Sequence, residues 1–316
     1  MVLWISAALA AVAFSLANTV RGETDRTSTE LDDIRGYYLA TGAVDRAAVE
    51  LLWSVTLQQG EKERKIKQGS AWVDYTFPTG VAHVELIPET SKLDVNNIPP
   101  EQLMRLLIAL NVDPGPAVEI TRAIIARRGG APAAGNPPIS QGVGPSFPVP
   151  GASLQEIEEL LSVRGITPEL FYGTYVPALV EPGPGEPRLI RRSGLVDCLS
   201  VFGSKTQVDA NTADPAVLAA IGITPDGIQM LLQQRRIAPF TQERIGQLIP
   251  MLGPGGQMLR LEGNSILTIR ATARVRLANG QLSDMKRTVA AQVKYMPASY
   301  STPIHFLRWY DATWSN

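Results

Sequence analysis

The fold is decided by the stretch VLWISAALAAVAFSLANTV at residues 2–20, which carries no charged side chain. In a helix, about 20 apolar residues span the ~30 Å hydrocarbon core of a bilayer. A secretory signal peptide is the main alternative, but nothing basic precedes this run and the run is long for a signal core. We therefore predict a membrane anchor at residues 1–22. Its apolar side chains include Val2, Leu3, Trp4, Phe14 and Leu16.

A helical pattern continues after this stretch. Apolar residues recur at helical spacing with charged residues between them: Leu31, Ile34, Tyr38, Val44, Ala48, Leu51, Leu52 and Val55. The first of the 24 prolines is Pro78, so nothing in this region breaks a helix. We predict one helix of about 55 residues, about 80 Å long. Its part at 23–58 would be amphipathic and lie on a folded domain.

Composition limits the classes of partner and chemistry. The chain has 316 residues and a formal net charge of −1, which gives no electrostatic basis for binding nucleic acid. Its single cysteine, Cys198, cannot form an intramolecular disulfide, and no role for it is indicated.

Extended segments flank a long helical stretch. Residues 71–77 and 81–87 read as strands joined by the turn Pro78-Thr79-Gly80. From residue 265, apolar side chains alternate strictly with Thr and Arg, and Asn279-Gly280 is a typical hairpin turn. We predict one antiparallel sheet built from 70–92 and 265–297, and therefore an α+β fold. A large all-helical insert at 93–252 would interrupt this sheet, and a tail at 298–316 would follow it.

The insert contains an internal repeat. The run Val208-Asp209-Ala210-Asn211 echoes Leu93-Asp94-Val95-Asn96. The matching positions are Asp94, Asn96, Pro100 and Leu103 in the first copy and Asp209, Asn211, Pro215 and Leu218 in the second. Each copy reads as a strand end, a helix, a Gly/Pro turn and a second helix, which is a helix-hairpin-helix-like (SAM-like) unit.

The insert therefore divides into four segments. We expect repeat one at 93–128, a mobile loop at 129–150, helices at 153–180 and repeat two at 208–252. The helices at 153–180 would begin at the capping box Ser153-Leu154-Gln155-Glu156.

The polar residues of the repeat allow two interpretations. Carboxylate and amide oxygens of Asp94, Asn96, Asp209 and Asn211 are of a kind that could hold calcium. We favour turn and cap hydrogen bonds, because Asp and Asn satisfy backbone donors where strands pass into helices. One cysteine and two separated histidines do not make a zinc site, and His83 reads as a strand-face residue. No catalytic constellation is present, so we expect no enzymatic activity.

A second hypothesis comes from the same repeats. Helix-hairpin-helix units can bind DNA phosphates through turn amides, so the chain could be a membrane-anchored DNA-binding protein. Against this, the turns near Asp113-Pro114 and Pro225-Asp226 place an acid where phosphate would approach, and proline lacks an amide donor. Nucleic acid is therefore not the partner that we expect.

Several segments together resemble a known family. They are Val2-Leu3-Trp4, the helix from Tyr38-Leu39-Ala40 to Glu50-Leu51-Leu52, the Lys92–Asn96 segment, the run ELLSVRGIT at 159–167, and Val208–Ala213. Over nearly its whole length, the chain resembles general secretion pathway protein K, the large minor pseudopilin of type II secretion.

The resemblance implies a pilin-like fold, with an anchored helix on an antiparallel sheet and a large inserted helical domain. It implies a non-enzymatic role at the tip of a pseudopilus that supports protein export. The implied partners are the I and J minor pseudopilins, the major pseudopilin and the inner-membrane assembly platform. A single inner-membrane pass with a periplasmic bulk follows. Pseudopilins begin with a leader cut by a prepilin peptidase, and we expect such a leader upstream of Met1. No cofactor is required, although some members hold calcium through ligands that cannot be mapped here.

Overall fold

The computed structural model describes residues 2–56, 66, 70–129, 153–177, 189–261, 265–296 and 303–311. Most of the expected loop at 129–150 lies outside these residues. The chain divides into two compact units. The first contains the long N-terminal helix and the strands from both ends of the chain, and the second is formed by the sequence between those strands.

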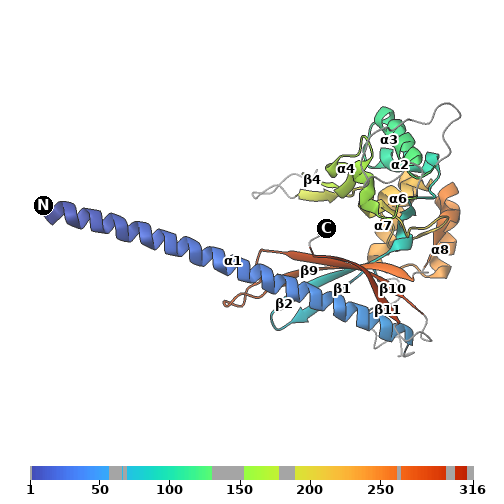
Figure 1. Ribbon diagram of the computed structural model, residues 1–316. Coiled ribbons are helices and arrows are strands. Elements are labelled where there is room, and N and C mark those ends of the chain that lie inside the picture. Colours follow the sequence, from blue (N-terminus) through green and yellow to red (C-terminus); the bar gives the residue numbers. More distant parts are fainter. Residues whose placement is uncertain are drawn as a thin grey trace. The chain divides into compact units, whose positions relative to one another are not determined.

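The first unit begins with a single helix. Helix α1 runs without interruption from Val2 to Thr56 (Figure 1), which confirms the prediction of one long rod. Residues 2–7 and 9–31 are exposed to solvent, and the buried positions begin at Gly36. The sheet of this unit therefore covers only the second half of the helix.

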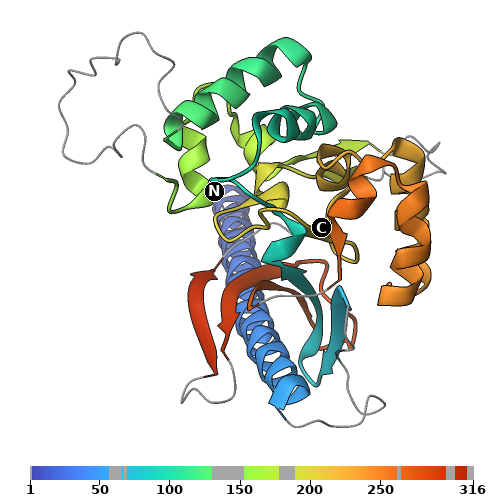
Figure 2. The same cartoon turned by 90° about the vertical axis from the view of Figure 1, so that its right-hand side faces the viewer.

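Five strands form the sheet of the first unit, in the order β1-β2-β9-β10-β11. They are β1 (Trp72–Phe77), β2 (Gly80–Pro88), β9 (Ile266–Val275), β10 (Arg287–Tyr295) and β11 (Ile304–Tyr310). β1 pairs antiparallel with β2, and β10 with β11. β2 lies next to β9, so the strands predicted before and after the insert do belong to one sheet. Figure 2 shows this sheet curving around one side of α1.

The sheet buries the side chains that alternate toward α1. Ile269, Ala271 and Ala273 on β9 are fully buried, as the alternation in the sequence predicted. α1 packs most extensively on β10. Gly36 allows this approach, because a Cβ atom there would lie 3.0 Å from the Cβ of Arg287. Tyr75 on β1 donates a hydrogen bond to Glu50 of α1 at 2.8 Å, which fixes the far end of the helix.

The opposite face of the sheet is more polar. His83 on β2 lies across from Asp74 on β1, with Nδ1 2.7 Å from Oδ1, so His83 is a strand-face residue. On β9, Arg270 is the exception to the expected exposure, because it is buried and pairs with Glu85 at 2.6 Å.

The expected C-terminal tail at 298–316 is partly wrong, because residues 304–310 form the edge strand β11. The aromatic run Phe306-Leu307-Arg308-Trp309-Tyr310 lies in this strand. The register shifts between Gln292 and Val293, where β11 carries one extra residue, Leu307. Such a bulge interrupts strict alternation, and this helps to explain why the pattern was not recognised as a strand.

The second unit is mainly helical. Its longer helices are α2 (Pro100–Ala109), α3 (Pro114–Arg127), α7 (Pro225–Ile237) and α8 (Gln242–Leu248). The shorter ones are α4 (Pro168–Tyr172), α5 (Leu195–Cys198), α6 (Pro215–Ala220), and the 3-10 helices η1 (Glu89–Ser91), η2 (Ile157–Ser162), η3 (Ile249–Met251) and η4 (Pro254–Met258). The two helices expected in each repeat are therefore present, as α2–α3 and α6–α7.

The second unit is not all-helical, which corrects the prediction. Its described residues contain three two-stranded sheets. β3 (Leu93–Asp94) pairs in parallel with β6 (Leu199–Ser200), and β7 (Val208–Asp209) pairs in parallel with β8 (Leu259–Arg260). β4 (Thr174–Pro177) and β5 (Leu189–Arg192) form an antiparallel pair. Two- to four-residue strands carry too little periodicity to be recognised in a sequence.

The predicted capping box at Ser153–Glu156 is wrong, because the helix begins three residues later than expected. Residues 153–156 are not helical, and the helix that follows is the short η2, with Glu156 rather than Ser153 at its N-cap. The Glu159 side chain accepts a hydrogen bond from the Glu156 amide at 3.0 Å. The predicted helices at 153–180 are therefore η2 and α4, followed by strand β4.

Candidate assembly surface

The first half of α1 is an exposed apolar rod. Val2, Leu3 and Trp4 are each more than four-fifths exposed, and Phe14 and Leu16 are about two-thirds exposed. The helix is long and apolar enough to cross a membrane by its length and composition. Exposed apolar surface of this extent needs a lipid or protein environment, so this part of α1 is a candidate membrane anchor.

A polar segment separates the rod from the rest of the helix. Residues 21–30 contain three threonines and one serine, and the three threonine hydroxyls donate to carbonyl oxygens one turn earlier. Arg26 pairs with Glu30 at 3.1 Å along the helix. This segment is exposed on every side among the described residues. A bilayer that holds residues 2–20 therefore cannot also cover the apolar residues beyond residue 30.

The second half of α1 has two apolar faces instead of the single stripe expected from the sequence. Val44 and Ala48 are buried against the sheet. Leu31, Ile34 and Tyr38 are 48%, 52% and 68% exposed. At about 100° per residue, the two sets are centred roughly 90° apart around the helix, and the pattern combined them because both have helical spacing.

The exposed face forms a continuous stripe that we call the outer stripe. It consists of Leu31, Ile34, Tyr38, Gly42, Asp45, Val49 and Trp53, which follow one another at spacings of three or four residues. Such spacing keeps side chains on one side of a straight helix. No other described element of the first unit covers the large apolar side chains of the outer stripe, and Trp53 is 52% exposed.

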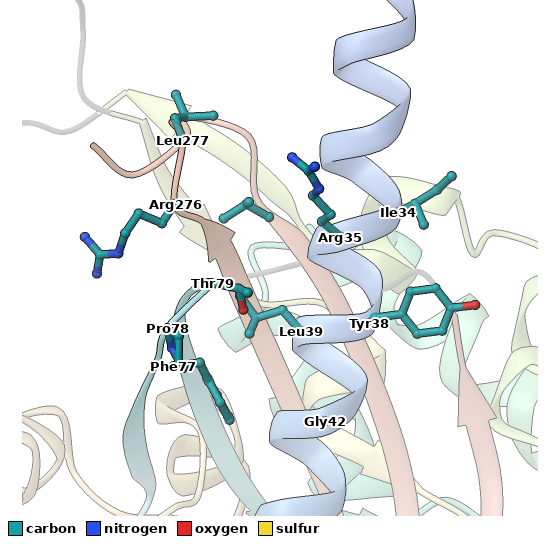
Figure 3. A pocket seen from close by; sticks show the side chains of 11 residues that line it. Ile34, Arg35, Tyr38, Leu39, Gly42, Phe77, Pro78, Thr79, Arg276 and Leu277 are labelled. Carbon is teal, nitrogen blue, oxygen red and sulfur yellow. The ribbon is translucent and has the colours of Figure 1, made fainter. Parts of the chain in front are cut away.

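A groove lies beside this stripe. It has a volume of about 700 Å³ and lies between residues 34–42 of α1, the β1–β2 turn and the end of β9. Figure 3 shows Leu39 pointing from α1 toward Thr79, while Tyr38 projects from the other side of the helix. Pro78 and Leu277 complete the apolar wall. A Cβ atom added at Gly42 would have no neighbour within 4 Å, so the helix surface there opens into free space.

The charges of this region have distinct partners. Arg35 lines the groove and pairs with Asp32 at 3.3 Å. Arg46 pairs with Glu50 at 2.9 Å and lies over the ring of Tyr75. Partial burial raises the pKa of Asp45, the one charged member of the outer stripe. A carboxylate in such a place favours a basic partner.

In the second unit, the side chains of the first repeat motif stabilise a turn. Asp94 accepts hydrogen bonds from the Asn96 amide at 2.8 Å and the Asn97 side chain at 2.7 Å. The Asn96 side chain donates to the Leu154 carbonyl at 2.9 Å and accepts from the Leu154 amide at 2.8 Å. Pro100 is the first residue of α2, and Leu103 is fully buried.

The second motif makes the same contacts. Asp209 accepts from the Asn211 amide at 3.3 Å and from the Thr212 hydroxyl at 2.5 Å. Asn211 donates to the Phe240 carbonyl at 3.3 Å and accepts from the Phe240 amide at 2.7 Å. Pro215 begins α6, and Leu218 is fully buried. The Asp and Asn side chains of both motifs thus form hydrogen bonds within the second unit.

The turns of both repeats use their amides internally. Asn111 and Val112 donate to carbonyls of α2 at 2.9 and 3.0 Å. Gly222 and Ile223 donate to carbonyls of α6 at 3.0 and 3.1 Å, and Thr224 donates to the Leu252 carbonyl at 3.4 Å. Phosphate binding at a hairpin requires amides that point outward. These turn amides are therefore not free to donate hydrogen bonds to DNA phosphates.

The described residues contain no group of three or more His, Cys, Asp or Glu side chains placed to hold a metal ion. Cys198 is completely buried, and burial, with Asp214 and Asp197 nearby, raises its pKa well above the usual value.

Comparison with known proteins gives a match among solved structures. A scan of protein-family models and a search of curated proteins both found no match. Among solved structures, the chain is similar to one chain of the GspK-GspI-GspJ complex from the type 2 secretion system of enterotoxigenic Escherichia coli. The TM-score is 0.51 at 15% sequence identity, and the alignment covers 92% of this chain and 100% of the other.

The two chains share a fold. The match spans both compact units, because it covers nearly the whole of this chain. The resemblance noted in the sequence is confirmed at the level of the fold.

Proposed function

We propose that this protein is a minor pseudopilin of a type II secretion system. The observation that supports this most is the whole-length similarity of fold to a chain of the GspK-GspI-GspJ complex. The exposed apolar half of α1 agrees with it, because such a helix suits both a bilayer and a bundle of similar helices.

In this role the protein would be structural. We propose that α1 holds it in the inner membrane by a single pass, with the two compact units in the periplasm. The second unit would cap the tip of the pseudopilus together with the I- and J-type minor pseudopilins, and so support export of folded proteins. The major pseudopilin, the assembly platform and a prepilin peptidase would be further partners. No cofactor enters this function.

The alternative, a membrane-anchored DNA-binding protein, has less support. Its two helix-hairpin-helix-like repeats are present, but their turn amides are bonded within the unit and their turns carry Asp113 and Asp226. A near-neutral net charge gives little attraction to phosphate.

One pull-down separates the two functions. The tagged full-length chain is co-expressed with the I- and J-type minor pseudopilins of its own host, solubilised in mild detergent and captured. We expect both subunits to be retained and a DNA fragment to pass through at moderate salt. Retention of DNA without pseudopilins would overturn the proposed function and direct mutagenesis to the two repeats.

A further inference from the structure

The β4–β5 ribbon of the second unit is apolar and exposed on both of its faces. Figure 1 shows the ribbon extending away from α4. Leu189 and Ile190 are neighbours on β5, so their side chains point to opposite faces of the ribbon, and they are 57% and 51% exposed. The cross-strand register places Tyr175, which is 51% exposed, on the face of Leu189, and Val176 on the face of Ile190. The described residues of the unit therefore leave both faces open.

A ribbon of two short strands is incomplete as a sheet. Two-stranded hairpins are at best marginally stable in water, and a third strand or a packed layer normally supplies the missing contacts. β4 and β5 have four residues each, and among the described strands they pair only with each other. A strand added at the edge would extend both apolar faces at once, whereas a helix would cover only one of them. The ribbon therefore favours a strand as the element that completes it.

The two edges of the ribbon differ in what they offer to a third strand. β4 ends at Pro177, which has no amide hydrogen to donate. Every residue of β5 has an amide, and no described strand pairs with its outer edge. Extended peptides add to sheets at edges of this kind, where main-chain hydrogen bonds supply affinity. We therefore expect a third strand to lie beside β5.

The arginines of β5 favour a partner of one charge. Arg191 pairs with Asp197 at 2.7 Å and its side chain is 7% exposed, so its charge is already compensated inside the unit. Arg192 is exposed and shares the face of Ile190, because alternate residues of a strand share a face. A strand beside β5 would be stabilised by a carboxylate next to Arg192 and an apolar side chain next to Ile190.

A bilayer and a second copy of the chain both fit this surface less well. The segment at 178–188 that joins the two strands contains Glu181 and Glu186, and a ribbon inserted tip-first would carry both carboxylates into the bilayer. Two copies joined along β5 would bring together strands that each carry two arginines and no acidic residue.

We propose that β5 is a docking edge for an extended segment of a different protein chain, which adds a third strand to the β4–β5 ribbon. This segment carries a carboxylate that faces Arg192 and, two positions away, an apolar residue that faces Ile190. The contact goes beyond the proposed function, because it lies wholly in the second unit and does not involve α1.

A peptide titration with the full-length chain in mild detergent tests the charge selection. The probe is a fluorescent hexapeptide of valine and threonine with one glutamate two positions from a valine, and its match carries lysine instead of glutamate. Both are made in both sequence orders, so that parallel and antiparallel addition are sampled. The parent should bind the glutamate probe about fivefold more tightly than the lysine probe, and Arg192→Glu should reverse this preference. Arg236→Glu, on an exposed part of α7, is the matched control and should leave the preference unchanged.

Two further peptides test the backbone pairing without changing the protein. They are glutamate probes that are N-methylated on alternate amides, one on the odd positions and the other on the even positions. Only one edge of an added strand faces β5, so one of these peptides should bind like the unmethylated probe and the other should lose binding. Hydrogen exchange at the amides of β5 should also slow when the unmethylated probe is present.

Other results would overturn the proposal. Equal affinity of the parent for the two probes, or an unchanged preference in Arg192→Glu, would show that Arg192 does not select the partner. Equal binding of the two methylated peptides would exclude strand addition. Photocrosslinking from p-benzoylphenylalanine in place of Leu189, with the chain in liposomes and the glutamate probe present, should give an adduct with the probe. An adduct only with a second copy of the chain, or only with lipid, would assign the surface to self-association or to the bilayer.

Discussion

Asn96 and Asn211 make the same pair of hydrogen bonds at equivalent places in the two halves of the helical unit. Each side chain binds the amide and carbonyl of one residue, Leu154 for Asn96 and Phe240 for Asn211. These partners lie 58 and 29 residues further along the chain. Each bonded residue precedes a short helix, η2 or α8. The internal duplication therefore extends beyond the residues that reveal it in the sequence.

This arrangement predicts how much stability is lost when either asparagine side chain is removed. Asn96→Ala and Asn211→Ala each leave a backbone amide and carbonyl without their partner, and we expect a loss of about 1–3 kcal/mol in the free energy of unfolding. Denaturant unfolding of the detergent-solubilised chain measures it. Gln242→Ala, on the exposed first turn of α8, should change stability little. Losses below about 0.5 kcal/mol for both asparagines would contradict the assignment.

Two glycines of α1 should respond in opposite ways to alanine. At Gly42 a Cβ atom meets nothing, so Gly42→Ala should stabilise the fold by about 0.5–1 kcal/mol through helix propensity. At Gly36 the added Cβ would lie 3.0 Å from the Cβ of Arg287, so Gly36→Ala should be destabilising as α1 is pushed from β10. The comparison is made by thermal unfolding, and equal shifts for the two variants would be inconsistent with this packing.

Cys198 should be inert in the folded protein. Its side chain is completely buried and its thiol pKa is raised, so both access and thiolate formation are suppressed. We expect negligible labelling by a maleimide near pH 8 in native conditions and complete labelling in denaturant. Because the chain has one cysteine, the signal reports this site alone. Rapid native labelling would show that the helical unit opens there.

Asp214 gives the helical unit a pH dependence of defined sign. Burial raises the pKa of its carboxyl in the folded state, an effect increased by nearby Asp197 and opposed by hydrogen bonds from Ser193 and the Ala216 amide and by Arg235. The folded state therefore binds this proton more tightly than the unfolded chain. The resulting stabilisation is present below the unfolded pKa and is lost as pH rises through the folded pKa.

Asp214→Asn removes this titration but keeps an oxygen that can cap α6 through the Ala216 amide. Measured between about pH 4 and about pH 7, the stability of the parent relative to the variant should fall as pH rises. If the stability of the parent and of the variant changed equally with pH, the Asp214 carboxyl would have the same pKa in the folded and unfolded chains.

Much of this architecture was predictable from the sequence. The long helical periodicity near the N-terminus predicted α1. Strict alternation predicted β9. The Asn279-Gly280 pair predicted the turn after β9, where Gly280 has a φ of +82°. Pro100 and Pro215, two matching positions of the repeat, are the first residues of α2 and α6. These features depend on local chemistry, which a single sequence carries in full.

The remaining features depend on contacts between distant residues. The parallel pairs β3–β6 and β7–β8 join segments far apart in the chain, and each strand has only two residues. The outer stripe was missed for a different reason. A helical pattern shows which residues share a face, but it does not show that the sheet covers Val44 and Ala48 and leaves Tyr38 exposed.

The adjacency of β2 and β9 imposes an order on folding. The chain leaves the sheet at Pro88 and returns to it at Ile266, so the sheet cannot close until almost the whole polypeptide has emerged. The contacts of the helical unit lie within one continuous part of the chain, so that unit can form earlier. Throughout that interval the face of α1 that carries Val44 and Ala48 has no β9 or β10 to cover it. A chaperone or another transient protein partner would need to protect this face of α1 until the last strands arrive.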